Sequence, residues 1–175
     1  MNVSLTEPKK RKYTFFGAAM FLRPTLLEQR TLVQNYDAKK IAACAREKPH
    51  EWECLLMKRN YLDFSWDHIG GHNEINEFPS QTMIREVQEE VGWNVKDYME
   101  VCRQWKNGFL NGFVYLVIPE QPNFMSDTPP RVPCDEVQTV EYFNLLHLLK
   151  SEQFKPNVKG RIQAFISNKS DFTLQ

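Results

Sequence analysis

The pattern of hydrophobic and polar positions along this chain predicts both strands and helices. Short apolar and aromatic runs between turn residues are typical of strands, and apolar residues three and four apart are typical of helices. On these patterns we predict strands at residues 13–22, 53–58, 98–105, 109–118 and 137–143. We predict helices at residues 38–46, 79–91, 145–150 and 156–168, and loops at residues 60–78 and 119–135. The dipeptide Asn107-Gly108 predicts a tight turn between two of the strands.

The predicted helix at residues 79–91 has clear ends and two unlike sides. Pro79 suits the first turn of a helix, and Gly92 suits the left-handed position that follows the last turn. At about 100° per residue, two sets of side chains fall on opposite sides, namely the hydrophobic Ile84, Val87 and Val91 and the acidic Glu86, Glu89 and Glu90. One side is therefore expected to pack, and the other to carry three neighbouring carboxylates.

Three carboxylates on one turn repel one another, so they destabilise the helix unless water or a cation offsets the charge. Carboxylate oxygens are ligands that Mg²⁺ accepts, together with water and phosphate oxygens. Such ions attract an anionic phosphate chain and lower the pKa of bound water. Gly70-Gly71 lets the backbone approach the same point, and Glu77 is placed to join the cluster or to hold Arg85. Helix geometry alone leaves open the alternative of a simple solvated face.

Composition and charge limit the classes of function. The chain has 175 residues, 42% of them hydrophobic, which indicates one globular domain. Its 22 basic and 22 acidic residues balance, so no overall field attracts nucleic acid or membrane. The longest apolar run, residues 15–22, is too short to span a bilayer, and we expect no membrane partner. The scattered cysteines are expected to be reduced thiols of an intracellular protein: Cys44, Cys54, Cys102 and Cys134.

Residues 71–93 resemble the signature of the Nudix hydrolase family. That signature is Gly, five residues, Glu, seven residues, then Arg-Glu-aliphatic-any-Glu-Glu-any-Gly-aliphatic. Its positions are filled by Gly71, Glu77, Arg85, Glu86, Val87, Glu89, Glu90 and Gly92, with Trp93 at the last apolar place. The family often has proline where this chain has Ile69 and glycine where it has Asn76. These two departures concern the shape of the loop and remove no ligand.

The resemblance implies an α/β fold of the Nudix type, an α/β/α sandwich with a mixed β-sheet between helices. Residues 13–175 would then form a single domain, with residues 25–50 as an insertion between the first two strands. It also implies an enzyme that hydrolyses a phosphoanhydride bond in a nucleoside-diphosphate-linked substrate, using Mg²⁺ or Mn²⁺.

Site residues carry over from the family position by position. Glu86, Glu89 and Glu90 resemble its metal ligands, and Glu86 is also a candidate general base. Arg85 resembles the residue that orients a box glutamate, and Gly71 resembles a ligand that binds metal through its backbone carbonyl. A further acidic ligand often comes from a later loop, where the chain offers Glu136, with Asp135 as a substitute.

The substrate is less closely indicated. After the box, this chain has Gly108 where ADP-ribose members tend to have proline, and Phe109 and Leu110 where dinucleoside tetraphosphate members tend to have tyrosine. Residues 141–156 resemble hydrolases of dinucleoside polyphosphates and diphosphoinositol polyphosphates. Candidate substrate contacts are Lys58, Arg59 and His72 for phosphates and Trp66 and Phe109 for a base. The alternatives are an exposed basic pair for the first two and ordinary packing for the aromatic residues.

Residues 1–12 are predicted to form a disordered tail that ends in the basic run Pro8-Lys9-Lys10-Arg11-Lys12. This run resembles a short nuclear-import signal, so we expect a cytoplasmic protein with nuclear entry as an alternative. It also offers contacts to RNA phosphates, which would suit a Nudix enzyme that removes a 5′ cap. A solvated tail and a catalytically silent Nudix-fold binding module remain as further alternatives.

Overall fold

The computed structural model describes residues 14–60, 65–125 and 135–175. The predicted basic tail, Cys134 and most of the proline-rich connection lie outside these residues. The strands are β1 (Phe16–Met20), β2 (Leu22–Pro24), β3 (Trp52–Arg59), β4 (Trp66–Asp67), β5 (Ile69–His72), β6 (Val95–Lys106), β7 (Phe109–Pro119), β8 (Val137–Asn144) and β9 (Asp171–Leu174). The helices are α1 (Leu27–Val33), α2 (Ala38–Glu47), the short 3₁₀ turn η1 (Pro49–Glu51), α3 (Pro79–Val91), α4 (Leu145–Lys150) and α5 (Pro156–Ile166).

The strands form two sheets. The larger sheet is mixed, with the order β5-β1-β7-β6-β9, in which β1 runs parallel to β7 and β9 parallel to β6. In the smaller sheet, β3 pairs antiparallel with β2, β4 and β8. The chain passes between the sheets at Phe21, which separates β1 from β2 and is fully buried. The first strands of the chain therefore tie the two sheets together.

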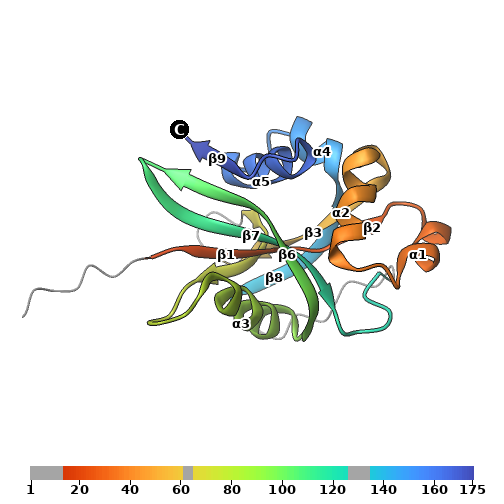
Figure 1. Cartoon of the computed structure of the whole chain (residues 1–175), viewed down its shortest axis with the longest axis horizontal. Helices are drawn as coiled ribbons and strands as arrows, with labels where there is room; N and C mark the ends of the chain where they lie inside the picture. The colour runs from red at the N-terminus through yellow and green to blue at the C-terminus, as the bar shows by residue number, and fades with distance from the viewer. Residues whose placement is uncertain (1–13, 61–64, 126–134) are drawn as a thin grey trace, which may run out of the picture.

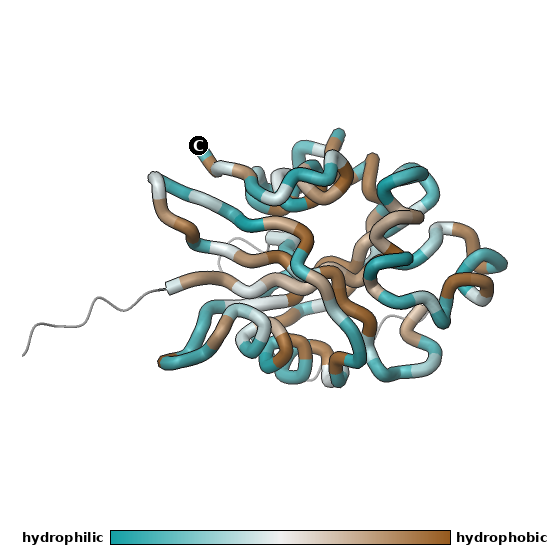
Figure 2. The backbone as a smooth tube through the Cα atoms, viewed as in Figure 1, coloured by the Kyte–Doolittle hydropathy of each residue, from teal (hydrophilic) through white to brown (hydrophobic). Residues whose placement is uncertain are grey.

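Helices cover both sides of the sheets (Figure 1). Helix α3 contacts β1, β5 and β7, whereas α5 contacts β6 and β9 and α2 contacts β6 and β7. Hydrophobic residues run along the strands that cross at the centre (Figure 2), and the largest fully buried side chains include Phe21, Phe165 and Met20. This is the expected α/β sandwich, except that its strands divide into two sheets instead of one.

Helix α3 has the bounds that the sequence predicts, and its ends show why. The side chain of Gln81 accepts a hydrogen bond from the backbone N–H of Phe78, and Gly92 ends the helix at φ 71°, in the left-handed region. The predicted packing stripe is partly wrong. Val87 and Val91 are buried, but Ile84 is exposed, and Met83 takes its place against the sheet.

Several other predictions need correction. The predicted loop at residues 60–78 contains β4 and β5, because these short segments gain their strand conformation from pairing with β3 and β1. The strand predicted at residues 13–22 divides into β1 and β2, and β2 extends beyond it to Pro24. Helix α1 and strand β9 were not predicted, whereas α2, the β6–β7 hairpin and α4 lie close to their predicted bounds.

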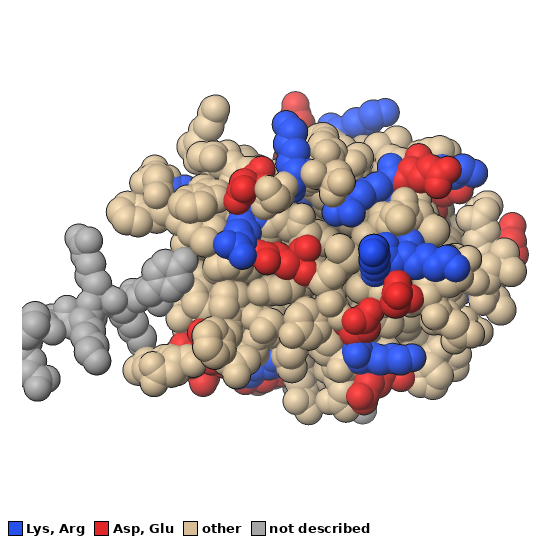
Figure 3. All heavy atoms as spheres, viewed as in Figure 1, with Lys and Arg blue, Asp and Glu red and all other residues tan. Residues whose placement is uncertain are grey.

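On the face shown in Figure 3, acidic and basic side chains are interspersed. Within residues 14–60, 65–125 and 135–175, no helix has both the length and the apolar character needed to cross a membrane. Of the cysteines described, Cys44, Cys54 and Cys102 are free thiols, the last two buried, and burial raises the pKa of Cys102 to about 12.

Candidate active site

Strand β5 and helix α3 meet at two glycines and two glutamates. The backbone N–H of Gly70 donates a hydrogen bond to Oε2 of Glu90 over 3.0 Å. The carbonyl of Gly70 accepts a hydrogen bond from Nη2 of Arg59 over 3.1 Å, so β5 is held between β3 and α3. This contact places Gly71 beside Glu86, one turn of helix before Glu90.

A cavity of about 490 Å³ opens at this junction. The acidic and glycine residues that line it are Asp67, Gly70, Gly71, Glu86, Glu90 and Glu136. The other lining residues are Phe16, Arg59, His72, Gln104, Asn111, Asn157 and Arg161. The cavity thus joins residues from both sheets, from α3 and from α5.

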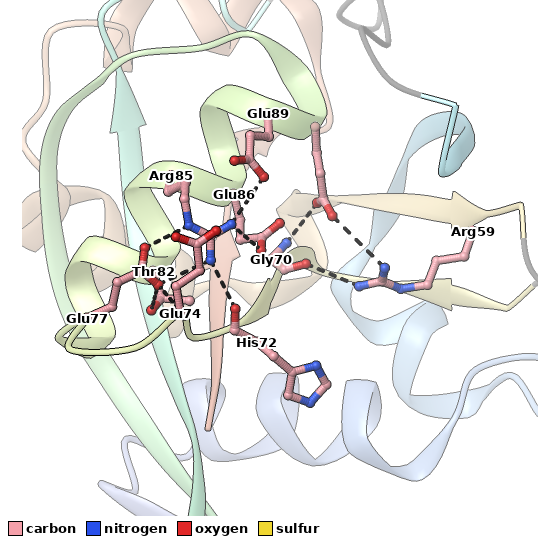
Figure 4. Close-up of polar contacts among 10 residues, drawn as sticks. Arg59, Gly70, His72, Glu74, Glu77, Thr82, Arg85, Glu86 and Glu89 are labelled. Carbon is pink, nitrogen blue, oxygen red and sulfur yellow. Dashed lines mark hydrogen bonds and ion pairs between the residues drawn. The ribbon is translucent and has the colours of Figure 1, made fainter. Parts of the chain in front are cut away.

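Arg85 organises the start of the site (Figure 4). Its Nε donates to Oε1 of Glu77 over 2.7 Å, its Nη1 donates to Oε1 of Glu86 over 2.8 Å, and its Nη2 donates to the carbonyl of His72 over 3.0 Å. Glu77 also accepts hydrogen bonds from the hydroxyl of Thr82 and the N–H of Glu74. The hydrogen bond from Arg85 is the main reason that the pKa of Glu77 falls to about 2. Glu77 therefore holds Arg85, one of the two roles that the sequence left open.

Glu90 and Glu86 have the opposite electrostatic environment. Glu90 is only 2% exposed, and burial raises its pKa to about 8, although the N–H of Gly70 and the charge of Arg59 act against the shift. Burial also raises the pKa of Glu86, and the neighbouring charge of Glu89 adds to the effect. Two carboxylates whose charge the protein offsets only in part line one cavity, which is typical of functional sites.

Gly71 leaves space that a side chain would fill. A Cβ atom at this position would lie 2.3 Å from Oε1 of Glu86, so the carboxylate occupies the space that any other residue would need. Arg85 binds Oε1 of Glu86, and no hydrogen bond to Oε2 is present among the described residues. One oxygen of Glu86 is thus positioned, and the other is available to a ligand.

Glu89 lies apart from the other two glutamates. Its side chain is 56% exposed, forms an ion pair of 3.1 Å with Nη1 of Arg85, and does not line the cavity. In the part of the chain that the structure describes, no three acidic, histidine or cysteine side chains are grouped so that they could hold a metal ion. A metal ion at Glu86 and Glu90 would therefore complete its coordination with backbone, water or substrate oxygens, as Mg²⁺ usually does.

The structure brings together some of the predicted contacts and not others. Glu136, Arg59 and His72 line the cavity, and in Figure 4 the imidazole of His72 points away from Arg85. Asp135, Lys58, Trp66 and Phe109 do not line it.

Lys58 and Trp66 are neighbours in the smaller sheet, away from the cavity. The ammonium of Lys58 lies 5.9 Å from the ring of Trp66, which packs edge-on against Phe143 at 4.8 Å between centroids. Phe109 is 68% exposed beside the β6–β7 turn. Successive residues of a strand face opposite ways, so Arg59 turns to the cavity and Lys58 does not.

The sequence prediction did not include six of the lining residues: Phe16, Asp67, Gln104, Asn111, Asn157 and Arg161. Arg161 is only 2% exposed, and it lies on the face of α5 that also buries Val158, Ile162 and Phe165. A charged residue within an apolar stripe was therefore a signal available in the sequence. Asp67 comes from β4, which was not predicted. The rest come from predicted strands and a predicted helix, and local pattern does not show that these elements meet at one cavity.

Comparison with known families agrees with this geometry. The family model for the NUDIX domain matches residues 38–164, most of the chain, and the chain therefore belongs to the Nudix family. It is a Nudix pyrophosphohydrolase, and Nudix hydrolases generally use divalent metal ions. No curated protein matches the chain.

Solved structures share the fold at low sequence identity. The NUDIX domain of Shewanella oneidensis NrtR, complexed with ADP ribose, aligns with a TM-score of 0.58 and 15% identity over 91% of each chain. An Ap4A hydrolase from C. elegans aligns with a TM-score of 0.55 and 15% identity, over 89% of this chain and 96% of the other. An ADP-ribose pyrophosphatase from Streptococcus suis aligns with a TM-score of 0.53 and 13% identity, over 92% and 98%. At these identities the similarity establishes the fold.

Proposed function

We propose that this chain hydrolyses a phosphoanhydride bond in a nucleoside-diphosphate-linked substrate, with Mg²⁺ as its cofactor. The observation that carries the proposal is the pair Glu86 and Glu90, two carboxylates of raised pKa that line one cavity beside Gly71. A buried negative charge that the protein leaves partly uncompensated favours a cation, and a cation favours a phosphate chain.

The donor set suits magnesium. Mg²⁺ is commonly bound by one or two carboxylates, with water and substrate phosphates completing an octahedron. Glu86 and Glu90 would hold it, with the carbonyl of Gly71 and the exposed Glu136 as further oxygen ligands on the same cavity. When bound, such an ion polarises the phosphate oxygens and lowers the pKa of a bound water.

The protein side chains have separate tasks in this proposal. Arg85 positions Glu86 by binding Oε1, which leaves Oε2 either to bind the metal ion or to accept a proton from the attacking water. Arg59 lies 4.0 Å from Oε1 of Glu90 and lines the cavity, so its guanidinium is placed to contact a phosphate of the substrate. Glu89 takes part in metal binding only if it leaves its ion pair with Arg85.

A substrate panel tests the activity. ADP-ribose, diadenosine tetraphosphate, a diphosphoinositol polyphosphate and a 5′-capped RNA are each incubated with Mg²⁺ or with EDTA in ¹⁸O-labelled water. We expect release of phosphate or a mononucleotide from at least one compound with Mg²⁺ alone, and the label identifies the phosphorus that is attacked. Absence of turnover across the panel would contradict the proposal.

Three single variants test the assignment of roles on the best substrate. We expect Glu86→Gln and Glu90→Gln each to lower kcat by about 100-fold or more, because each removes a charged ligand next to the reacting phosphate. Glu89→Gln serves as the matched comparison from the same helix. An equal loss in all three would mean that Glu89 turns into the cavity when metal binds. Full activity of Glu90→Gln would contradict the proposed metal site.

A further inference from the structure

The cavity contains a second polar group of residues, which neither the Nudix signature nor the proposed chemistry uses. Arg161, Gln104 and Asn111, here called the donor cluster, come from α5, β6 and β7 and are linked to one another. Arg161 and Gln104 are buried, at 2% and 4% exposed. Buried polar groups in a defined array need a physical reason, because each one loses hydration on folding.

Hydrogen bonds determine which atom each amide presents. The guanidinium of Arg161 only donates, and its Nε lies 3.2 Å from Oε1 of Gln104, so that oxygen must be the acceptor. The Nε2 of Gln104 therefore faces Asn111, where it donates to Oδ1 over 3.2 Å. The two N–H groups on Nδ2 of Asn111 are left, and no hydrogen bond uses them among the described residues.

Arg161 is held equally firmly. Its Nη1 donates to Oδ1 of Asp67 over 2.8 Å and lies 3.3 Å from Nδ1 of His68, while its guanidinium lies 5.0 Å from the ring of Phe16. The pKa of His68 falls to about 3 through burial and the charge of Arg161, so this imidazole is neutral and accepts at Nδ1. Nη2 of Arg161 has no hydrogen bond within the described residues. It is not one of their fully buried polar atoms that lack a partner, so it is accessible from the cavity.

The N–H groups of the cluster without a hydrogen bond among the described residues are thus two on Arg161, two on Asn111 and one on Nε2 of Gln104. A nucleobase edge or a sugar hydroxyl presents donors as well as acceptors, whereas a phosphoryl group at neutral pH presents almost only acceptors. The first turn of α5 also contributes Asn157 to the cavity, and the positive end of a helix dipole favours an anion. Asp67 is the nearest acidic group to the cluster, and its oxygens already face Arg161 and Arg59.

We propose that the donor cluster binds a phosphate group beyond the two that flank the scissile bond, so that Arg161 and Asn111 make this chain selective for substrates with three or more phosphates. The inference rests on the proposed function, since it assumes that the cleaved diphosphate lies against Glu86 and Glu90. The cluster would then determine specificity without taking part in the chemical step.

Asn111→Asp is the sharpest variant. Its carboxylate still accepts the hydrogen bond from Gln104, so the cluster keeps its links, but two donors become a negative charge. Asn94→Asp is the matched control, because Asn94 is exposed and does not line the cavity, and the net charge changes equally. Diadenosine tetraphosphate and ADP-ribose are the two substrates, with four and two phosphates.

We expect Asn111→Asp to raise KM for diadenosine tetraphosphate about tenfold or more and to change kcat little, since a charged hydrogen bond becomes a repulsion. KM for ADP-ribose should change less than about threefold, and Asn94→Asp should resemble the wild type with both. An equal change for both substrates, or none for either, overturns the inference.

Direct binding separates this inference from the proposed activity. Calorimetry measures the affinity of inorganic tripolyphosphate and pyrophosphate, with Mg²⁺ present, for the wild type and for Asn111→Asp. We expect the variant to lose about tenfold in affinity for tripolyphosphate and less than about threefold for pyrophosphate. This result would support the cluster even if no compound of the panel were hydrolysed, whereas equal affinities in both proteins would refute it.

Discussion

The Nudix signature, residues 71–93, has glutamates near both ends, but the protein shifts their pKa values in opposite directions. At one end Glu77 accepts hydrogen bonds from Arg85, Thr82 and the backbone, and its pKa falls to about 2. At the other end Glu90 is buried and accepts a hydrogen bond from the N–H of Gly70, and its pKa rises to about 8. The first carboxylate is stabilised as an anion by the fold, and the second is not.

This difference separates positioning from chemistry within one motif. Glu77 and Arg85 lock the loop that precedes α3 onto the helix, and the carbonyl of His72 joins the same network. Glu90 and Glu86 carry charge that the protein offsets only in part, so a ligand has to complete the compensation. The signature thus has two parts with different roles. Glu77 and Arg85 hold the loop against the helix, and Glu86 and Glu90 face the ligand.

The adjacent glycines of β5 give the largest expected contrast. Gly70 has φ 153°, and a Cβ there would lie 2.2 Å from the carbonyl oxygen of Gly17 in β1. We expect Gly70→Ala to destabilise the fold by about 3 kcal/mol, because the paired backbone of β1 cannot move away from the new Cβ without breaking the sheet. The three atoms nearest to a Cβ on Gly71 would all belong to the flexible carboxyl end of Glu86. We expect Gly71→Ala to cost less than about 1 kcal/mol but to lower kcat about 100-fold, since Glu86 must move.

Urea unfolding and kcat on the best substrate of the panel measure the two effects separately. Equal destabilisation by both alanine variants would mean that Gly71 is also required by the fold. A fully active Gly71→Ala enzyme would mean that the position of Glu86 beside β5 is not needed for turnover.

The raised pKa of Glu90 predicts a pH-dependent gain in stability for Glu90→Gln. Because the folded pKa, about 8, exceeds the ordinary 4.5, the folded state binds the proton more tightly, and stability is lost as pH rises through that window. In EDTA, urea midpoints should agree at about pH 4.5 and diverge toward about pH 9, where the variant is more stable by a few kcal/mol. A constant difference across this range would contradict the electrostatic account.

Glu77→Gln should behave in the opposite way and with a smaller effect. The folded pKa of Glu77, about 2, lies below the ordinary 4.5, so its contribution is present above about pH 4.5 and is lost as pH falls toward 2. We expect the variant to be less stable than the wild type by about 2 kcal/mol at neutral pH, from the weakened hydrogen bonds with Arg85. The same urea series measures it, and a variant as stable as the wild type at pH 7 would refute the positioning role.

Local pattern predicted those parts of the fold whose conformation depends on nearby residues. Helix α3 has the predicted bounds because Pro79 and Gly92 act on their own turns, and the β6–β7 turn follows from Asn107-Gly108, with Asn107 at φ 51° and Gly108 at φ 77°. Strands β4, β5 and β9 were missed because two to four residues carry no period of their own. Pairing with β3, β1 and β6 gives them their conformation.

The same distinction applies to the site. Helical spacing placed Glu89 and Glu90 together on the polar side, but β5 lies against α3 at Gly70 and buries Glu90 while Glu89 stays exposed. Lys58 and Arg59 are adjacent in the sequence, yet the alternation of β3 sends only Arg59 to the cavity.

The sequence by itself determined helix α3 and the grouping of the three glutamates, the arginine and the glycines around it. Helical spacing and end residues are local effects, so they depend only on neighbours along the chain. Only the tertiary structure decided which carboxylates lose their hydration and which donors face them. Those outcomes depend on contacts between β5 and α3 and between β6, β7 and α5. Burial raises the pKa of Glu90, and packing determines which donors of Arg161 are left free, so both exist only after these elements pack.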